Sequence, residues 1–176
     1  DDGTGNNAKD TYYAELSGKV ENLSLAAGYY KFEDVKEEPA GVDDTIWTVA
    51  ANYAFDKNFK LGAMYLNGDK DKYNGDDDGF VVTASYKGAK AAKAGSWGLV
   101  AKYYDQGAST YIDHTMNGLA DNALFTGDEG FKGYSVAANY TFAKNIVGAV
   151  EYYDLEDKWN SSNDLKTLWS QLVFTF

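Results

Sequence analysis

The stretch NYTFAKNIVGAVEYYDL, residues 139–155, decides the fold class. Apolar residues alternate with small or polar ones on both sides of a short break at Lys144-Asn145. Because successive side chains of a β-strand point to opposite faces, Tyr140 and Phe142 share one face and Asn139 lies on the other. The stretch therefore predicts two strands joined by a tight turn, with a strongly aromatic face.

Composition limits the classes of function. The chain has 176 residues, with 27 acidic and 16 basic side chains and a net charge of -11. This length suffices for one domain with a core. The acidic balance argues against nucleic acid as a partner, because no basic patch is expected to neutralise phosphates. Cysteine is absent, which excludes disulfides, thiolate metal sites and a thiol nucleophile.

An internal repeat predicts how the chain is built. Residues 50–66 (AANYAFDKNFKLGAMYL) and 137–153 (AANYTFAKNIVGAVEYY) share one pattern of strand, Lys-Asn turn and strand, with looser copies at 17–30 and 84–104. Asparagine tolerates the left-handed backbone of tight turns, so we expect it to form the turn in three of the four copies. Repeated antiparallel hairpins are therefore the predicted plan.

The order of the connections indicates a membrane barrel. We expect strands near 10–19, 23–33, 44–55, 59–68, 79–87, 96–105, 131–142, 146–155 and 165–176. Short connections fall near 20–22, 56–58, 88–95 and 143–145, and long polar ones near 34–43, 68–79, 106–129 and 156–164. No apolar run approaches the roughly 18 residues of a transmembrane helix. Strict alternation of short turns and long loops is typical of a transmembrane antiparallel up-and-down β-barrel of the bacterial outer membrane.

The two faces of these strands support this interpretation. One face is aromatic at its ends and aliphatic or small in the middle, as in Trp47, Val49, Ala51, Tyr53 and Phe55. This profile predicts a lipid-facing band between two aromatic girdles. The opposite face is polar, and its charged members are the predicted pore-lining residues: Glu15, Lys19, Lys60, Lys87, Lys102 and Glu151. The predicted lumen is water-filled; a narrow barrel plugged by salt bridges is the alternative.

The last strand resembles a known recognition signal, and the odd number of predicted strands raises a problem. The sequence ends LWSQLVFTF, which resembles the Phe-terminated last strand that the barrel-assembly machinery recognises; a buried edge strand of a soluble domain is the alternative. Bacterial single-chain barrels have even strand numbers with both ends periplasmic, so nine strands cannot close in that way. Either one strand is miscounted, or residues 1–176 are the C-terminal portion of a larger barrel whose upstream strands are missing. The polar start DDGTGNNAKD, without a signal peptide, favours the second interpretation.

The hairpins NYAFDKNFKLGAMY and NYTFAKNIVGAVEYYD, with the Phe-terminated last strand, resemble the C-terminal half of general porins that carry an S-layer-homology domain, the OmpM-like porins. The similarity lies in pattern and hairpin phrasing over nearly the whole chain. It implies a sixteen-stranded trimeric barrel and an N-terminal domain that grips the peptidoglycan of the cell wall. No position of this sequence matches that domain, so no wall-binding residue is assigned.

Candidate sites for chemistry are few. His114, the only histidine, lies in the longest loop, 106–129, which also holds Asp113, Asp121, Asp128 and Glu129. These four acids are predicted to form a constriction loop that biases passage toward cations; an external loop packed on its neighbours is equally open. The acidic loop 68–79 lacks the spacing of a calcium-binding EF-hand and is predicted to be solvated. We expect no catalytic residue, no cofactor and no metal site.

Three functions remain open at this level. The leading prediction is an outer-membrane porin for passive diffusion of small hydrophilic solutes and ions, in contact with membrane lipid and lipopolysaccharide, and trimeric by resemblance. The second is a closed eight-stranded outer-membrane barrel with an anchoring or adhesin role. The third is a soluble lipocalin-like barrel, which would need an apolar interior and a polar exterior. An enzyme is not expected.

Overall fold

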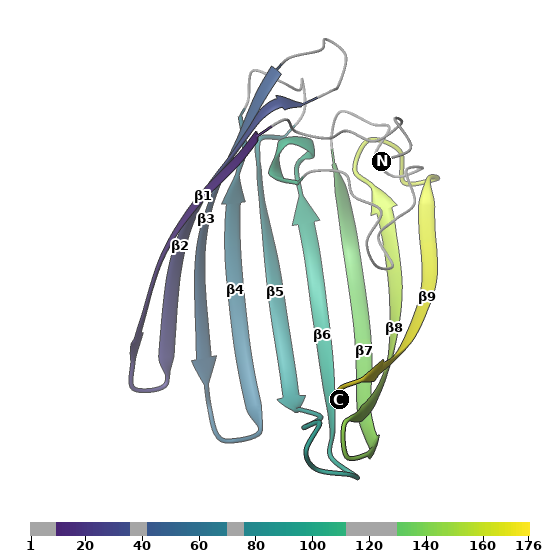
Figure 1. The fold of residues 1–176 in the computed structure, drawn as a ribbon. Helices are drawn as coiled ribbons and strands as arrows, with labels where there is room; N and C mark the ends of the chain where they lie inside the picture. Colours follow the sequence, from purple (N-terminus) through teal and green to yellow (C-terminus); the bar gives the residue numbers. More distant parts are fainter. Residues whose placement is uncertain (1–9, 36–41, 70–75, 112–129) are drawn as a thin grey trace.

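The computed structural model describes residues 10–35, 42–69, 76–111 and 130–176 (Figure 1). Nine strands dominate them: β1 (Asp10–Val20), β2 (Leu23–Val35), β3 (Val42–Ala54), β4 (Phe59–Asn67), β5 (Asp78–Lys87), β6 (Trp97–Gln106), β7 (Phe131–Ala143), β8 (Ile146–Asp157) and β9 (Asp164–Phe174). The only helical element of these described ranges is a 3-10 turn, η1 (Ala108–Thr110). The prediction of an all-β chain with nine strands is confirmed, and each predicted boundary lies within two residues of the observed one.

All nine strands belong to one sheet, in the order β1 to β9, and each is antiparallel to the next. Each strand thus pairs with its neighbours in the sequence, which is the up-and-down arrangement. No pairing joins β1 to β9 within the part of the chain that the structure describes. The sheet is curved but open, and β1 and β9 form its two edges (Figure 1).

The connections lie at two opposite ends of the sheet. The turns β1–β2, β3–β4, β5–β6 and β7–β8 lie together, at the lower end in Figure 1, which we call the turn end. The strand ends that flank the long connections lie at the upper end, which we call the loop end. The predicted alternation of short and long connections is therefore confirmed.

The turn residues correct one detail of the prediction. Asn145 has the left-handed backbone expected of it, with φ of 66°, but in the first hairpin the positive φ of 51° falls on Glu21 instead of Asn22. In the β3–β4 turn, Asp56 supplies the turn chemistry: its carboxylate accepts the backbone N–H groups of Asn58 at 2.6 Å and Phe59 at 2.8 Å. A side chain that caps its own turn removes the need for a left-handed asparagine.

The two faces of the sheet differ sharply in burial. Strand register keeps the predicted apolar positions on one face, because Ala51 pairs with Ala63 and Leu61 pairs with Ala84. This outer face is exposed even at large apolar residues, with 59% of Val49 and 46% of Val136 accessible. The opposite, inner face holds the buried residues. The described chain therefore leaves its most apolar sheet surface uncovered.

Aromatic residues form two rows on the outer face. In five strands the same pair of positions is aromatic, six residues apart: Trp47 and Tyr53, Phe59 and Tyr65, Phe80 and Tyr86, Trp97 and Tyr103, Tyr134 and Tyr140. At about 3.3 Å per residue, six residues separate the rows by about 20 Å along a strand. Aliphatic or small residues fill the interval. One aromatic row therefore lies near each end of the sheet, and a single apolar band lies between the two rows.

A small hydrophobic core lies on the inner face, at the loop end. Its members are Leu66, Val81, Tyr104, Phe131, Tyr153, Leu155 and Leu165, with Met64 and Tyr111 packed against them. Phe131 and Leu155 are only 2% and 1% exposed. Toward the turn end the inner face becomes polar. The inner face is thus apolar and covered near the loops, and polar below.

Candidate functional site

The inner face collects most of the predicted pore-lining residues. Residues that pair across neighbouring strands point to the same face of the sheet. Glu15 pairs with Gly28, Lys60 with Ser85, and Lys102 with both Thr83 and Ser135. Lys19 and Glu151 lie on the same face, opposite Ser24 and Ala137. Five of the six charged residues therefore share the polar part of the inner face.

Lys87 is placed differently from the other five. It ends β5 with a φ of 58°, and its ammonium lies 4.2 Å from the ring centroid of Trp97 and 5.3 Å from that of Tyr86. Both rings belong to the outer-face aromatic row at the turn end. The left-handed backbone directs the Lys87 side chain away from the inner face, and the cation–π contact holds its ammonium against the outer-face rings at the turn end.

A short polar chain connects the hydrophobic core to the polar inner face. The Tyr104 hydroxyl lies 3.3 Å from Ser135 Oγ, and Ser135 Oγ donates to Glu151 Oε1 at 3.4 Å. Ser135 is 2% exposed, so its hydroxyl is satisfied by these protein groups. This arrangement orients the Glu151 carboxylate along the inner face.

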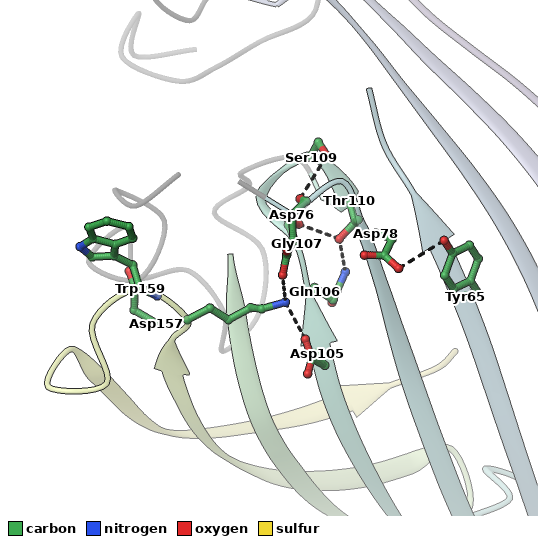
Figure 2. A network of polar contacts seen from close by, with 11 residues as sticks. Tyr65, Asp76, Asp78, Asp105, Gln106, Gly107, Ser109, Thr110, Asp157 and Trp159 are labelled. Atoms are coloured by element: carbon green, nitrogen blue, oxygen red, sulfur yellow. Dashed lines mark hydrogen bonds and ion pairs between the residues drawn. The ribbon is translucent and has the colours of Figure 1, made fainter. Parts of the chain in front are cut away.

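The chain folds inward directly after β6. The residues of η1 and the preceding Gly107 are buried, and η1 contacts β3, β4 and β5 in addition to following β6. We call Gly107–Tyr111 the inward segment. Its Thr110 hydroxyl donates to the Gly107 carbonyl at 2.8 Å and accepts from Gln106 Nε2 at 3.3 Å (Figure 2). The segment therefore covers the loop end of the inner face.

Glycine at position 68 permits this close approach. A Cβ placed on Gly68 would meet the backbone carbonyl of Ser109, well inside contact distance. A backbone carbonyl cannot swing aside as the end of a flexible side chain can. Gly68 is thus required where the β4–β5 connection and the inward segment touch.

Lys158 links the β8–β9 connection to the β4–β5 connection and to the end of β6. Its ammonium lies 2.6 Å from Asp76 and 2.7 Å from Asp105, and its side chain is only 15% exposed. Burial alone lowers the pKa of Lys158, but its hydrogen bonds to Asp105 and Asp76 outweigh burial and raise the pKa above 10.5. Asp157 beside it accepts the backbone N–H of Trp159 at 2.7 Å (Figure 2). The pair of carboxylates fixes the β8–β9 connection beside the inward segment.

Replacing Lys158 by glutamine is expected to lower the free energy of unfolding by about 1–2 kcal/mol, because two charge-assisted hydrogen bonds are lost. Since the folded pKa is raised, this contribution is complete below the unfolded value and fades only as pH rises through the folded pKa. The gap between the two proteins in urea unfolding should therefore stay constant from about pH 6 to about pH 9.

Lys166→Gln is the matched control, since its ion pair with Asp164 has the same 2.7 Å length but is half-exposed. Solvent screening makes such a pair nearly neutral for stability. Equal losses in the two variants would contradict the structural role of Lys158.

The predicted constriction acids, Asp113, Asp121, Asp128 and Glu129, lie outside the described residues, as does His114. Only the start of their loop is described, and that start is the inward segment. In the described ranges no three His, Cys, Asp or Glu side chains group to hold a metal ion. No helix in these ranges has the length and apolarity to cross a membrane.

Two features are not predicted by the alternation of polar and apolar residues. The first is the hydrophobic core, although Met64, Leu66, Tyr153 and Leu155 mark apolar inner positions near the loop end. The second is the group of lysines in the short connections. Their signal was available, since Lys57, Lys90 and Lys93 stand in connections nearly free of acids.

Comparisons with known proteins add no relative. A scan against protein-family models finds no match, and a search of curated proteins finds none either. The fold itself defines the class: in the described residues it is an all-β sheet of nine up-and-down antiparallel strands with an exposed apolar face. The likeness to OmpM-like porins stays a prediction from the sequence.

Proposed function

We propose that this chain is part of an outer-membrane porin, in which solutes and ions pass along the polar inner face. One observation carries the proposal: the exposed outer face is an apolar band between two aromatic rows, while the other face of the same strands holds charges. Soluble proteins rarely expose apolar patches beyond a few hundred Å². A lipid-facing sheet with a wet lumen has this distribution by necessity.

Tyrosines at the loop end support contact with a membrane interface. Tyr65 donates its hydroxyl to Asp78 at 3.3 Å, and Tyr134 and Tyr152 both donate to Asp154 at 3.3 Å. Each ring thus lies on the apolar band and each hydroxyl meets a carboxylate at the edge. Amphipathic rings at the boundary of lipid and water behave in this way.

An open sheet needs further strands to enclose a lumen. The resemblance to OmpM-like porins supplies a candidate arrangement, a sixteen-stranded trimer in the bacterial outer membrane. In that arrangement the turn end faces the periplasm, the loop end faces lipopolysaccharide, and Phe176 is the signal for the barrel-assembly machinery.

A second candidate is an anchoring or adhesin barrel without a conducting pore. The observation that favours it is the hydrophobic core on the inner face, closed by the inward segment. A soluble lipocalin-like barrel is disfavoured, because its exterior would be polar, and the outer face here is the apolar one.

Single-channel recording of the full-length protein in a planar lipid bilayer tests the proposal. The porin predicts stepwise currents that are linear in voltage. Insertion must be verified independently, for example by resistance of the inserted strands to protease. Silent bilayers with verified insertion would reject the porin and favour the anchoring barrel.

A further inference from the structure

A cavity of about 620 Å³ opens at the turn end, between the β3–β4 turn and the β5–β6 connection. Its lining contains five lysines and no acidic residue. We call it the lysine pocket, after Lys57, Lys60, Lys87, Lys90 and Lys93. Asn58, Ser96 and Trp97 also line it. In a chain of net charge -11, five clustered positive charges are the opposite of the average surface.

The lysines of the pocket differ from those of the loop end in their partners. At the loop end, Lys132 pairs with Glu156, Lys158 with Asp76 and Asp105, and Lys166 with Asp164. None of the five pocket lysines forms an ion pair with any residue in the described ranges. Like charges gathered around one cavity repel one another, and an anion bound between them removes that repulsion.

Few acidic side chains near the pocket could pair with its lysines in place of a bound anion. Asp56 is the one acid in the connections 55–58 and 88–96. Its carboxylate is held by the backbone N–H groups of Asn58 and Phe59, and these hydrogen bonds lower the pKa of Asp56 below its usual value. The carboxylate therefore mainly closes its own turn, and the charge of the neighbouring Lys57 is a smaller contribution to its lowered pKa.

The β5–β6 connection holds its lysines on an anchored backbone. Ala89 donates its N–H to Asn139 Oδ1 at 2.9 Å, and the Thr141 hydroxyl donates to the Lys90 carbonyl at 3.1 Å. Asn145 donates its N–H to the Ala91 carbonyl at 2.7 Å. Because β7 and its turn fix this connection, Lys90 and Lys93 reach the cavity from a defined position. Preorganised donors lose less entropy when they bind a ligand.

We propose that the lysine pocket binds the phosphate group of an anionic solute at the turn end of the protein. Lysine is a common point-charge partner of phosphate, and the cavity volume falls in the usual range for small ligands. This goes beyond diffusion, because it gives the protein a saturable site. Any effect on transport rests on the proposed function, whereas binding itself does not.

Calorimetric titration of inorganic pyrophosphate into the full-length, detergent-solubilised protein at low salt tests the site. We expect saturable binding to one site that weakens as salt is added. Replacing Lys57, Lys90 and Lys93 together by glutamine should weaken it at least about tenfold, since three charged donors are removed.

The matched control replaces Lys31, Lys132 and Lys166 by glutamine. These lysines pair with Glu33, Glu156 and Asp164 away from the pocket, so the control changes the net charge equally but leaves the pocket intact. It should shift the affinity less than about twofold. Equal weakening in both triple variants would show diffuse attraction only and would overturn the proposal. Absence of saturable heat in the unaltered protein would overturn it too. Neither result depends on conduction, so failure here is distinct from failure of the porin.

Trp97 provides a reporter of location. Lys87 lies over its ring, so phosphate that draws Lys87 into the pocket should change the emission of Trp97. Trp97→Phe should remove the optical signal while calorimetric binding persists. An emission change of equal size in Trp97→Phe would place the anion elsewhere and contradict the assignment.

The phosphate could also belong to a lipid headgroup, and the source is distinguished by the membrane used. In nanodiscs of zwitterionic phosphatidylcholine, a solute site keeps its affinity for pyrophosphate. A headgroup site would instead lose affinity for pyrophosphate in discs of anionic phosphatidylglycerol, because the lipid would occupy the pocket. If the unaltered protein shows this loss and the Lys57, Lys90 and Lys93 triple variant has the same affinity in both kinds of disc, the pocket belongs to a headgroup and the solute assignment is overturned.

Discussion

Replacing Ala138 by arginine is expected to lower the free energy of unfolding from lipid vesicles by about 2–4 kcal/mol. Ala138 lies on the outer face, opposite Leu99 and Val150, near the middle of the band between Tyr134 and Tyr140. A guanidinium there must enter hydrocarbon if the outer face contacts lipid. Urea titration of the vesicle-inserted protein, followed by tryptophan emission, measures the loss.

The control is the neighbouring alanine. Ala137 lies on the inner face, opposite Glu151, so an arginine there gains a carboxylate neighbour and stays in water. Ala137→Arg should change the free energy of unfolding by less than about 1 kcal/mol. If both substitutions have the same effect, or if only Ala137→Arg destabilises, the assignment of the outer face to lipid is wrong.

Replacing Gly68 by alanine is expected to dislodge the inward segment. The new methyl group would occupy the position of the Ser109 carbonyl, and the segment must move to relieve the overlap. Such overpacking costs about 1–3 kcal/mol of stability. Where the protein conducts, we also expect a larger single-channel conductance, because the loop end of the inner face is uncovered.

Gly18→Ala serves as the control, since a Cβ at Gly18 in β1 meets no atom within 4 Å. It should be neutral or slightly stabilising, because alanine has fewer conformations in the unfolded chain. A stable Gly68→Ala protein with unchanged conductance would contradict the described position of the inward segment.

The strands and their faces could be predicted because they depend on local alternation. Over most of each strand, apolar residues recur at every second position, and this period alone decides which side chains share a face. The six-residue repeat of aromatic pairs, as in Phe80 and Tyr86, is likewise a property of the sequence. Neither feature depends on contacts with residues far away in the sequence.

A constriction by the loop 106–129 was one of two open predictions, but the contacts that place the inward segment could not be predicted, because they join residues far apart in the sequence. Its place is fixed by Gly68 and by the fold of the chain around Lys158, whose partners Asp76 and Asp105 are far away in the sequence. The left-handed backbone at Glu21 and Lys87 could not be predicted either, since neither residue type favours it. In both cases tertiary structure overrides a local preference.

The measurement that tests the central claim most directly is quenching by brominated lipids of single-tryptophan variants in vesicles. Trp47 and Trp97 lie on the outer face, Trp169 lies on the inner face opposite Glu151, and Trp159 lies in the β8–β9 connection. We expect strong quenching of Trp47 and Trp97 and little of Trp169 and Trp159. Quenching of Trp169 alone, or of no tryptophan in protein shown to be vesicle-bound, would contradict a lipid-facing outer surface.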